Sequence, residues 1–340
     1  MHTRRCFSFA MVLLSGLTLL VWLGMMPRTP AAGDASAIRA GPAMHGPLLR
    51  LGIVPERDIF RQRQRYRALA EYLSQRLSRQ VELRTVRTYQ DVIEDFREKK
   101  VEAAFLGSLV AVLAVDQLDA QVLLKTQLPG GICSYRGVIV VPEDSPIQSV
   151  QDLRGKRIAM VRTTLAGHLF PMAEFSRHRW LDDPSAAPTP LWVGTHDEVI
   201  GAVHAGQADA GALKDLRLHE LEKVQQPKLR LRRLAISQAV PENALVVRRD
   251  VVDPLGAELA AELMKMDSTP QGRAVLEQFG AERFVPCSLE EYSAIYEMSE
   301  LLAARWNAIG LSGAPPVRRP GAATSRSSWL LPQAGPPNGA

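Results

Sequence analysis

Apolar residues along the middle of the chain follow two alternating spacings, one typical of strands and one typical of helices. Short runs such as Leu49–Val54 and Val138–Val141 are apolar and rich in β-branched residues. Between such runs lie stretches such as residues 60–78, in which Leu69 and Leu73 recur at helical spacing. Strands that alternate with amphipathic helices predict βαβ units and a mostly parallel sheet, so the fold class is α/β.

The two spacings divide the chain into predicted elements. We expect strands at residues 49–54, 81–85, 101–106, 121–126, 138–142, 157–161, 191–193, 208–213, 229–236 and 243–248. We expect helices at residues 60–78, 89–96, 109–118, 165–177, 196–205, 255–266, 271–278 and 289–308. Thr88 followed by Asp91 resembles a capping box, and Ser108 and Thr195 are expected to cap the helices that follow them.

Three of the predicted strands end in polar residues that begin a helix. These strand ends are Gly107-Ser108, Thr163-Thr164 and Thr195-His196-Asp197. Ligands of open α/β sheets bind beyond the carboxyl ends of the strands, and a helix start offers unpaired N–H groups and the positive end of the helix dipole. If the three helix starts converge, they form a site for a small oxyanion.

The two ends of the chain differ from its middle. Basic residues at positions 2–5 precede an apolar run, Phe7–Met26, that is long for a signal peptide and about long enough to span a bilayer. Small residues after it permit cleavage, so residues 1–47 are interpreted as an export signal or a membrane anchor with a linker. Cys6 precedes the apolar run and is badly placed to accept a lipid. Residues 311–340, rich in Pro, Gly, Ala and Ser, are predicted to be a disordered tail.

Composition and charge exclude several classes of protein. The chain is 46% hydrophobic and 23% charged, which is typical of a globular protein. Its net charge of +5 comes from basic residues that are not interleaved with stacking aromatics, which favours a solvated face over a nucleic-acid surface. The common nucleophile, phosphate-loop and zinc motifs are missing, so we expect no enzyme activity, metal or cofactor. Cys133 and Cys287 remain available for a disulfide, which the sequence leaves open.

Five segments of the chain resemble type 2 periplasmic binding proteins, and among them the phosphate, phosphite and phosphonate substrate-binding subunits of ABC transporters. The segments occur in the order typical of that family: LGIVP at 51–55, VEAAFLG at 101–107, YRGVIVVPEDSPIQSVQDLRGKRIA at 135–159, GTHDEVIGAVHAGQADAGAL at 194–213 and VPENALVVRRDV at 240–251. The resemblance extends over about residues 49–296.

The resemblance implies two α/β lobes with mixed sheets, joined by two crossing strands, with a ligand cleft between them. Lobe one would comprise residues 48–137 and 246–310, and lobe two residues 138–245. Val138–Val141 would be the outward crossing strand, and Leu245–Arg248 the return.

The resemblance also implies site residues. Family members carry three hydroxyl side chains for the phosphonate oxygens where this chain has Thr164-Leu165-Ala166, so two hydroxyls are missing. Backbone N–H groups, with Thr163 or His168, could take their place, and the ligand could differ from the usual phosphonate. The complete set of predicted ligand-binding residues is Ser108, Tyr135, Arg136, Thr163, Thr164, His196 and Asp197.

Each of these residues also has a purely structural interpretation. The two threonines and His196-Asp197 suit helix caps and first turns, and Arg136 could brace the hinge rather than touch a ligand. Asp197 repels an anion and better suits an amine on the ligand.

The sequence therefore predicts an exported, periplasmic solute-binding protein that closes on a small anionic or zwitterionic ligand and passes it to an ABC permease. The alternative is a sensor anchored in the inner membrane by residues 7–26, which would report ligand state to a membrane signalling partner. An enzyme built on the same fold has no residue constellation in its favour.

Overall fold

The computed structural model describes residues 46–53, 59–86, 88–183, 185–225 and 230–317. All of these residues belong to one compact unit of the chain. Residues 1–45 of the predicted export segment and residues 318–340 of the predicted tail lie outside the described residues. Within the described ranges, no helix has both the length and the apolar character needed to cross a membrane.

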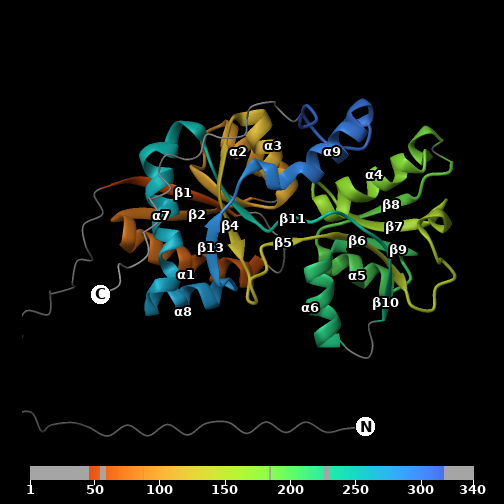
Figure 1. The fold of residues 1–340 in the computed structure, drawn as a ribbon, viewed down its shortest axis with the longest axis horizontal. Coiled ribbons are helices and arrows are strands. Elements are labelled where there is room, and N and C mark those ends of the chain that lie inside the picture. The colour runs from red at the N-terminus through yellow and green to blue at the C-terminus, as the bar shows by residue number, and fades with distance from the viewer. Residues whose placement is uncertain (1–45, 54–58, 87, 184, 226–229, 318–340) are drawn as a thin grey trace, which may run out of the picture. The chain divides into compact units, whose positions relative to one another are not determined.

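The first lobe is built on a six-stranded sheet in the order β13-β4-β12-β3-β1-β2 (Figure 1). Its strands are β1 Gly46–Ile53, β2 Arg79–Thr85, β3 Ala103–Leu106, β4 Gln121–Gln127, β12 Ala244–Val247 and β13 Arg283–Pro286. β1 runs parallel to β2 and β3, whereas β12 is antiparallel to β3 and β4. The sheet is therefore mixed.

Helices cover both faces of this sheet, which explains why its central strands are apolar on both sides. They are α1 Ile59–Leu77, α2 Tyr89–Arg97, α3 Ser108–Leu118, α7 Ala257–Met264 and α8 Pro270–Phe279. Phe105 packs in one apolar cluster with residues of α1, α7 and α8, and its neighbours Ala104 and Leu106 pack in another cluster that includes α2 and α3. Successive side chains of β3 point to opposite faces of the sheet and therefore pack into two different apolar clusters.

The second lobe contains a five-stranded sheet in the order β10-β6-β9-β7-β8. Its strands are β6 Gly137–Pro142, β7 Arg157–Val161, β8 Thr189–Val193, β9 Ala210–Lys214 and β10 Leu231–Ile236. Its helices are α4 Phe170–Arg177, α5 His196–His204 and α6 Asp215–Gln225, and a single π-helical turn, η2 Leu165–Leu169, leads into α4. β7 is parallel to β8 and β9, and β6 is antiparallel to β9 and β10.

The chain passes between the lobes through a two-stranded sheet, β5 Ser134–Tyr135 paired antiparallel with β11 Val240–Pro241 (Figure 1). The crossings predicted at Val138–Val141 and Leu245–Arg248 are wrong by one strand in each case, because the chain crosses earlier, at β5 and β11. The structure instead places these segments within the two large sheets, as β6 and β12. Their continuous apolar character reflects burial inside a sheet covered by helices, and does not mark a crossing.

Most other predicted elements are confirmed, one predicted helix cap is wrong, and helix α6 was missed. The capping box is present, because Asp91 N–H donates to Thr88 Oγ1 at 3.2 Å and Thr88 N–H to Asp91 Oδ2 at 3.0 Å. Ser108, however, is the first residue of α3 and not its cap, which is Gly107. Helix α6 was not predicted, because its apolar residues lack a clear helical stripe: Leu218 is fully buried while Val224 is 82% exposed.

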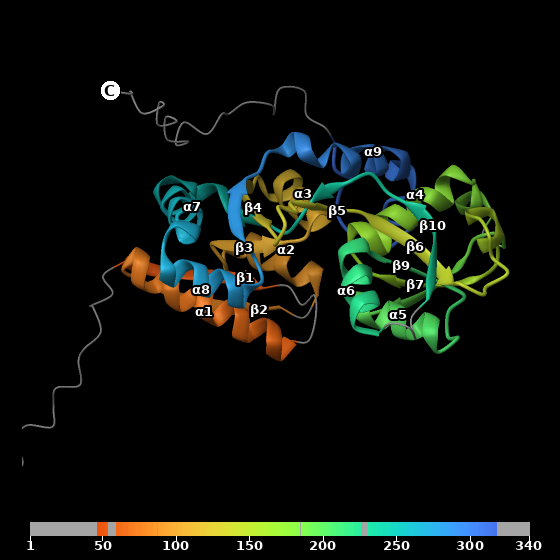
Figure 2. The same ribbon diagram turned by 60° about the horizontal axis from the view of Figure 1, so that its bottom comes forward.

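Helix α9, Ser293–Leu302, contacts both lobes (Figures 1 and 2). It packs against α3 of the first lobe and against α4 and η2 of the second. The segment after it continues the contact: Arg305 Nε donates to Leu181 O at 3.4 Å, and Val317 N–H donates to Asp116 Oδ2 at 2.9 Å. Side chains from both lobes and from α9 consequently share one apolar cluster.

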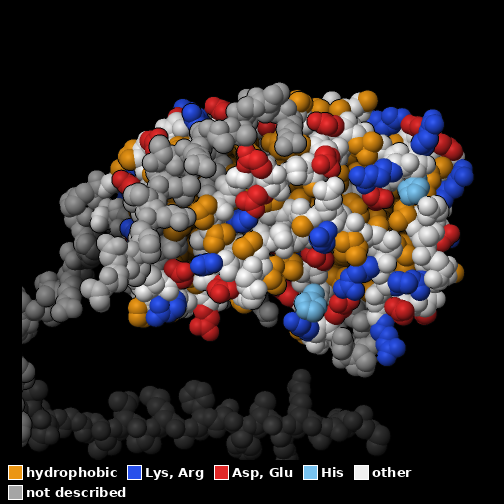
Figure 3. Space-filling view, viewed as in Figure 1, with side chains coloured by type: hydrophobic (Ala, Val, Ile, Leu, Met, Phe, Trp, Pro, Cys, Tyr) orange, Lys and Arg blue, Asp and Glu red, His pale blue; other side chains and the backbone are white. Residues whose placement is uncertain are grey.

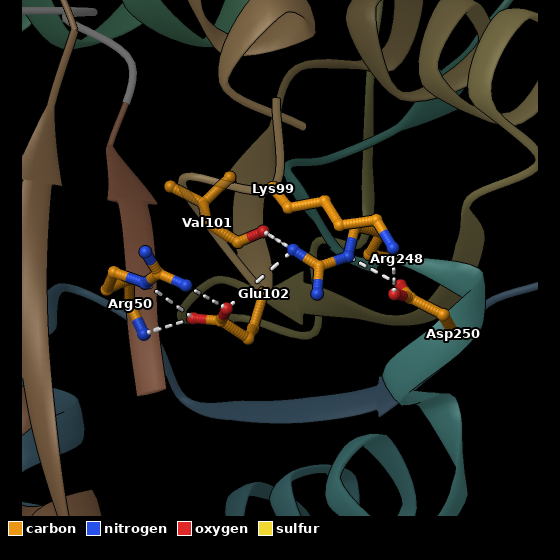
Figure 4. Close-up of polar contacts among 6 residues, drawn as sticks. All are labelled: Arg50, Lys99, Val101, Glu102, Arg248 and Asp250. Atoms are coloured by element: carbon orange, nitrogen blue, oxygen red, sulfur yellow. Dashed lines mark hydrogen bonds and ion pairs between the residues drawn. The ribbon is translucent and has the colours of Figure 1, made fainter. Parts of the chain in front are cut away.

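Glu102 links three strands of the first lobe through charged hydrogen bonds (Figure 4). It accepts from Arg50 at the backbone N–H (2.8 Å) and at both Nε (3.1 Å) and Nη2 (2.6 Å). Arg248 Nη1 lies 3.7 Å from Glu102 Oε1 and donates to Val101 O at 2.8 Å. These contacts join three neighbouring strands: Arg50 lies in β1, Glu102 directly precedes β3, and Arg248 directly follows β12. They lie at the opposite end of β3 from Gly107.

We expect Glu102→Gln to lower the free energy of unfolding by about 2 kcal/mol, because a buried carboxylate that serves two guanidinium groups is lost. Urea denaturation monitored by circular dichroism measures the change. Glu71→Gln is the matched control, since the Arg67–Glu71 pair lies on an exposed helix face and should contribute less than about 0.5 kcal/mol. Equal effects of the two substitutions would contradict the importance of this network.

Candidate functional site

A cavity of about 90 Å³ lies between the two lobes, and all three predicted helix starts contribute to its wall. The residues from these starts are Gly107, Ser108, Leu109 and Val110 of α3, Thr163, Thr164 and Leu165 at η2, and His196 of α5. Further lining residues come from α1, α6 and the end of α8. Figure 3 shows the surface notched at its lower edge between the lobes, with acidic and basic side chains interspersed on this face.

Ser108 holds the start of α3 against the crossing segments. Its side chain is fully buried, and its Oγ lies 2.7 Å from Pro241 O and 3.2 Å from the Tyr135 hydroxyl. A carbonyl oxygen only accepts, so the Ser108 proton goes to Pro241 and Tyr135 donates to Ser108. Both predicted residues line the cavity, and their side chains also bind the two halves of the β5–β11 sheet to α3.

The Thr163-Thr164 turn is shaped by its own hydrogen bonds. The Thr164 hydroxyl donates to Val161 O and accepts from Gly167 N–H, each at 3.0 Å, and so caps η2. Its only proton is thereby used, so in this arrangement the hydroxyl has none to give an anion. Thr163 adopts φ +53°, a left-handed conformation that is uncommon for a β-branched residue. The N–H groups of the η2 start remain the natural donors at this wall.

His168 fixes that unusual turn from behind. It is fully buried, its Nδ1 accepts from Thr163 N–H at 3.0 Å, and its Nε2 lies 2.8 Å from Ile309 O. These partners require a neutral ring with the proton on Nε2. Burial lowers the pKa of His168 to about 4, with a smaller contribution from the Arg162 charge. His168 therefore connects the turn to the segment after α9 and does not line the cavity.

His196 and Asp197 occupy adjacent positions at the start of α5 but have different surroundings. Thr195 caps the helix by accepting from Glu198 N–H at 3.2 Å, and His196 lines the cavity. Asp197 instead accepts both hydrogen bonds of a bidentate pair with Arg217 of α6, of which Nη2 to Oδ2 measures 2.7 Å. This pair, more than any other contact, raises the pKa of the Arg217 guanidinium.

Arg136 stands apart from the other predicted residues. It is exposed, and its Nη1 donates to Ser237 O at 2.8 Å while its backbone N–H donates to Asp215 Oδ1 at 2.9 Å. It is not among the residues that line the cavity. These contacts join the segment after β5 to the segment before β11 and to the start of α6.

Several charged lining residues were missed by the sequence analysis. They are Arg65 of α1, Lys214 at the end of β9, Arg217 and Glu220 of α6, and Glu242 after β11. The rule that identified the other helix starts, a strand ending in polar residues, also applies to Lys214-Asp215. No comparable local signal marks Arg65, because the tertiary structure alone brings α1 to the cavity.

Four of these charged lining residues form two ion pairs. Arg217 donates from Nη1 to Glu220 at 2.6 Å, and Lys214 forms an ion pair with Glu242. The Lys214 ammonium also lies 4.2 Å from the centre of the Tyr135 ring, a cation–π contact. The cavity therefore offers helix starts and cations to an anion, and carboxylates to a donor.

Neither a disulfide nor a metal cluster is found in the part of the chain that the structure describes. Cys133 and Cys287 are both free thiols there, and burial raises the pKa of Cys287 to about 12. Among the same residues, no group of three or more His, Cys, Asp or Glu side chains is arranged to hold a metal ion.

Comparison with known proteins identifies a family and a fold. The family model described as ABC transporter, phosphonate, periplasmic substrate-binding protein matches residues 51–292. The phosphonates-binding periplasmic protein of Escherichia coli is 28% identical over 200 residues, which is 56% of this chain and 58% of that protein, so the match spans less than two thirds of its length. A probable ABC transporter phosphite-binding protein of Prochlorococcus marinus is 23% identical over 78% of this chain and 94% of its own.

Solved structures share the architecture. A Xanthomonas citri protein bound to ATP has a TM-score of 0.67 at 23% identity, and covers 77% of this chain and 99% of its own. The Prochlorococcus marinus protein, solved with methylphosphonate, has a TM-score of 0.64 at 21% identity, with coverage of 77% and 99%. Identities this low show the fold alone, which is the predicted arrangement of two α/β lobes.

We expect the free energy of unfolding to decrease as the pH falls, because the unfolded state takes up a proton at His168 more readily than the folded state does. The buried ring has a pKa near 4 against 6.5 for the free side chain, so the unfolded state binds more protons between these values. The contribution is complete above pH 6.5 and is lost as pH falls to 4, by roughly 3 kcal/mol. Urea denaturation at pH 7 and pH 4 should therefore show a smaller loss for His168→Gln than for the wild type.

The control for this experiment is His219→Asn on α6, where the imidazole is exposed. This variant should keep the full pH dependence of the wild type. Equal losses in the wild type and in His168→Gln would show that His168 does not carry the transition.

Proposed function

The chain belongs to the family of periplasmic substrate-binding proteins of phosphonate ABC transporters, and we propose that it clamps a small phosphonate, phosphite or phosphate-like ligand in the cavity between its lobes. The family is a substrate-binding component of transport systems and not an enzyme. The observation that carries the proposal is the meeting of three helix starts, at Gly107-Ser108, Thr163-Thr164 and His196, on one cavity. Such an arrangement binds an oxyanion through N–H groups and aligned dipoles.

In this proposal His196 and the backbone N–H groups of Ser108 and of the η2 turn contact the oxyanion, because the Ser108 hydroxyl proton is given to Pro241 O. Tyr135 packs behind Ser108, and Asp197 acts through Arg217 rather than on the ligand directly. Thr163 and Thr164 shape the turn that presents these N–H groups, through the left-handed backbone of Thr163 and the cap that Thr164 forms. Arg136 braces the hinge, about which the lobes close on the ligand.

The closed form would then dock on an ABC permease. The lobe boundaries are proposed to follow the β5–β11 crossing, so that lobe one ends before β5 and resumes after β11, and lobe two lies between these two strands. Residues 7–26 either are removed on export or tether the protein to the inner membrane. The alternative, a sensor for a signalling partner, depends on that tether and gains no support from the described residues.

We expect the purified protein to be stabilised by one class of phosphorus oxyanion in a thermal-shift screen of methylphosphonate, phosphite, phosphate and sulfate. A ligand at about 100 times its Kd adds about 2.7 kcal/mol to the free energy of unfolding. His196→Asn should weaken binding about tenfold, measured by calorimetry, because a hydrogen bond to a charged group is lost. His204→Asn, at the other end of α5, is the matched control. Failure of every oxyanion to bind would refute the proposal.

The role of the N-terminal segment can be tested separately. If residues 7–26 are a cleaved signal, N-terminal sequencing of protein recovered from the periplasm should begin near Ala32 or Ala37, where small residues permit cleavage. A retained segment would appear as full-length protein in the membrane fraction, and would leave the anchored-sensor alternative open.

A further inference from the structure

The last described segment of the chain, residues 303–317, contacts both lobes, and we call it the C-terminal strap. Arg305 forms an ion pair with Asp182 of the second lobe. Farther along the strap, Ser312 O accepts a hydrogen bond at 3.3 Å from Nε2 of Gln117, which belongs to α3 of the first lobe. The strap therefore links the lobes in addition to the two crossing segments.

The middle of the strap bonds a fully buried histidine of the second lobe. His168 Nε2 lies 2.8 Å from Ile309 O, and the strap residues Trp306 and Leu311, each 2% exposed, belong to the same apolar cluster as Leu169. Because a carbonyl oxygen only accepts, Ile309 fixes the ring proton on Nε2. The lone pair of Nδ1 is thereby left to accept a hydrogen bond.

That lone pair accepts from the turn that lines the cavity. Thr163 N–H donates to His168 Nδ1 at 3.0 Å, and both Thr163 and Thr164 line the cavity, whereas His168 does not. Thr163 has φ +53°, and no other β-branched residue in the described ranges has a positive φ. Such a conformation persists only where neighbouring groups hold it, and His168 is the side chain that bonds the Thr163 backbone.

We propose that His168 is a positioning residue for ligand binding: it holds the Thr163 turn in its left-handed conformation and, through Ile309, makes ligand affinity depend on the C-terminal strap. This inference rests on the proposed function, because it concerns the same cavity. A turn that relaxes must be restored before a ligand binds, so the affinity falls with the fraction of molecules in which the turn is in place. Among the described residues that line the cavity, none belongs to the strap.

Substitutions at position 168 of the full-length protein separate the hydrogen bond from packing. Asparagine places an amide oxygen near the position of Nδ1 but is too short to reach Ile309, and leucine supplies neither contact. By calorimetry with methylphosphonate and phosphate at pH 7, we expect His168→Leu to weaken binding by about tenfold or more. His168→Asn should weaken it by only about threefold, because the bond to Thr163 is kept.

The exposed His219→Asn on α6 is the control for these variants and should bind as the wild type does. Equal affinity of His168→Leu and the wild type would overturn the positioning role. Binding by His168→Asn as weak as that of His168→Leu would also overturn it, since the acceptor would then be irrelevant.

The dependence on the strap is tested by a double-mutant cycle. Arg305→Gln removes the ion pair with Asp182, and should weaken binding about threefold in the wild type but not in the His168→Asn background, where the link to Ile309 is already broken. Arg179→Gln is the matched control, because it removes a different ion pair with the same Asp182, and it should change neither affinity. An equal effect of Arg305→Gln in both backgrounds, or no effect in either, would overturn the dependence.

Amide hydrogen exchange of the ligand-free protein separates this inference from the proposed function. We expect the Thr163 amide to exchange about tenfold faster in His168→Leu than in the wild type, because its acceptor is lost. If exchange is unchanged, the turn is not held by His168 and the inference fails even where the oxyanions bind. If exchange is faster but the wild type binds neither methylphosphonate, phosphite nor phosphate, the proposed function is refuted, and the role of His168 in ligand binding with it.

Discussion

The cavity depends on the antiparallel pairing of the two segments that cross between the lobes. Val240 lies opposite Tyr135, and the ladder continues at both ends, where Glu242 N–H donates to Cys133 O and Ser237 N–H donates to Gly137 O, each at 2.8 Å. Because backbone hydrogen bonds fix the register, they also fix which side chains of the two crossings face each other. Ser108, bonded to Pro241 O, aligns the start of α3 with this ladder.

The pairing of the two crossing segments also brings Lys214 and Glu242 together as an ion pair. Lys214 ends a strand of the second lobe and Glu242 follows the crossing, so their ion pair exists only when the lobes and the crossing are correctly assembled. The side chains are 14% and 6% exposed, and a pair so buried gains little stability over an apolar one.

Helix α9 adds a constraint on movement. The proposed hinge closure would turn one lobe relative to the other, yet α9 packs against helices of both, and His168 bonds Ile309 beyond it. Any closure must therefore slide or bend apolar contacts that are continuous from α3 through α9 to α4. The turn at Thr163, which η2 and His168 support, lies where this continuous cluster meets the cavity.

Local structure was determined by the sequence to a large extent. The alternation of apolar runs specified the α/β class, and short-range chemistry specified the Thr88 and Thr195 caps, because a cap requires only residues three positions apart. The three polar strand ends were visible for the same reason. Even the missed helix α6 begins at a strand end of this kind, although its apolar residues are too irregularly spaced to reveal it.

Only the tertiary structure decided which of these polar groups are bonded within the protein and which remain available at the cavity. The Thr164 hydroxyl is used by Val161, Asp197 is used by Arg217, and Glu242 is half used by Lys214, and the two ion pairs join residues 20 and 28 positions apart in the chain. A hydrogen bond depends on distance and direction, and neither is encoded in residue type or short-range spacing. The sequence thus indicated which strand ends could form an anion site, whereas the folded chain determined which of their side chains are already bonded within the protein.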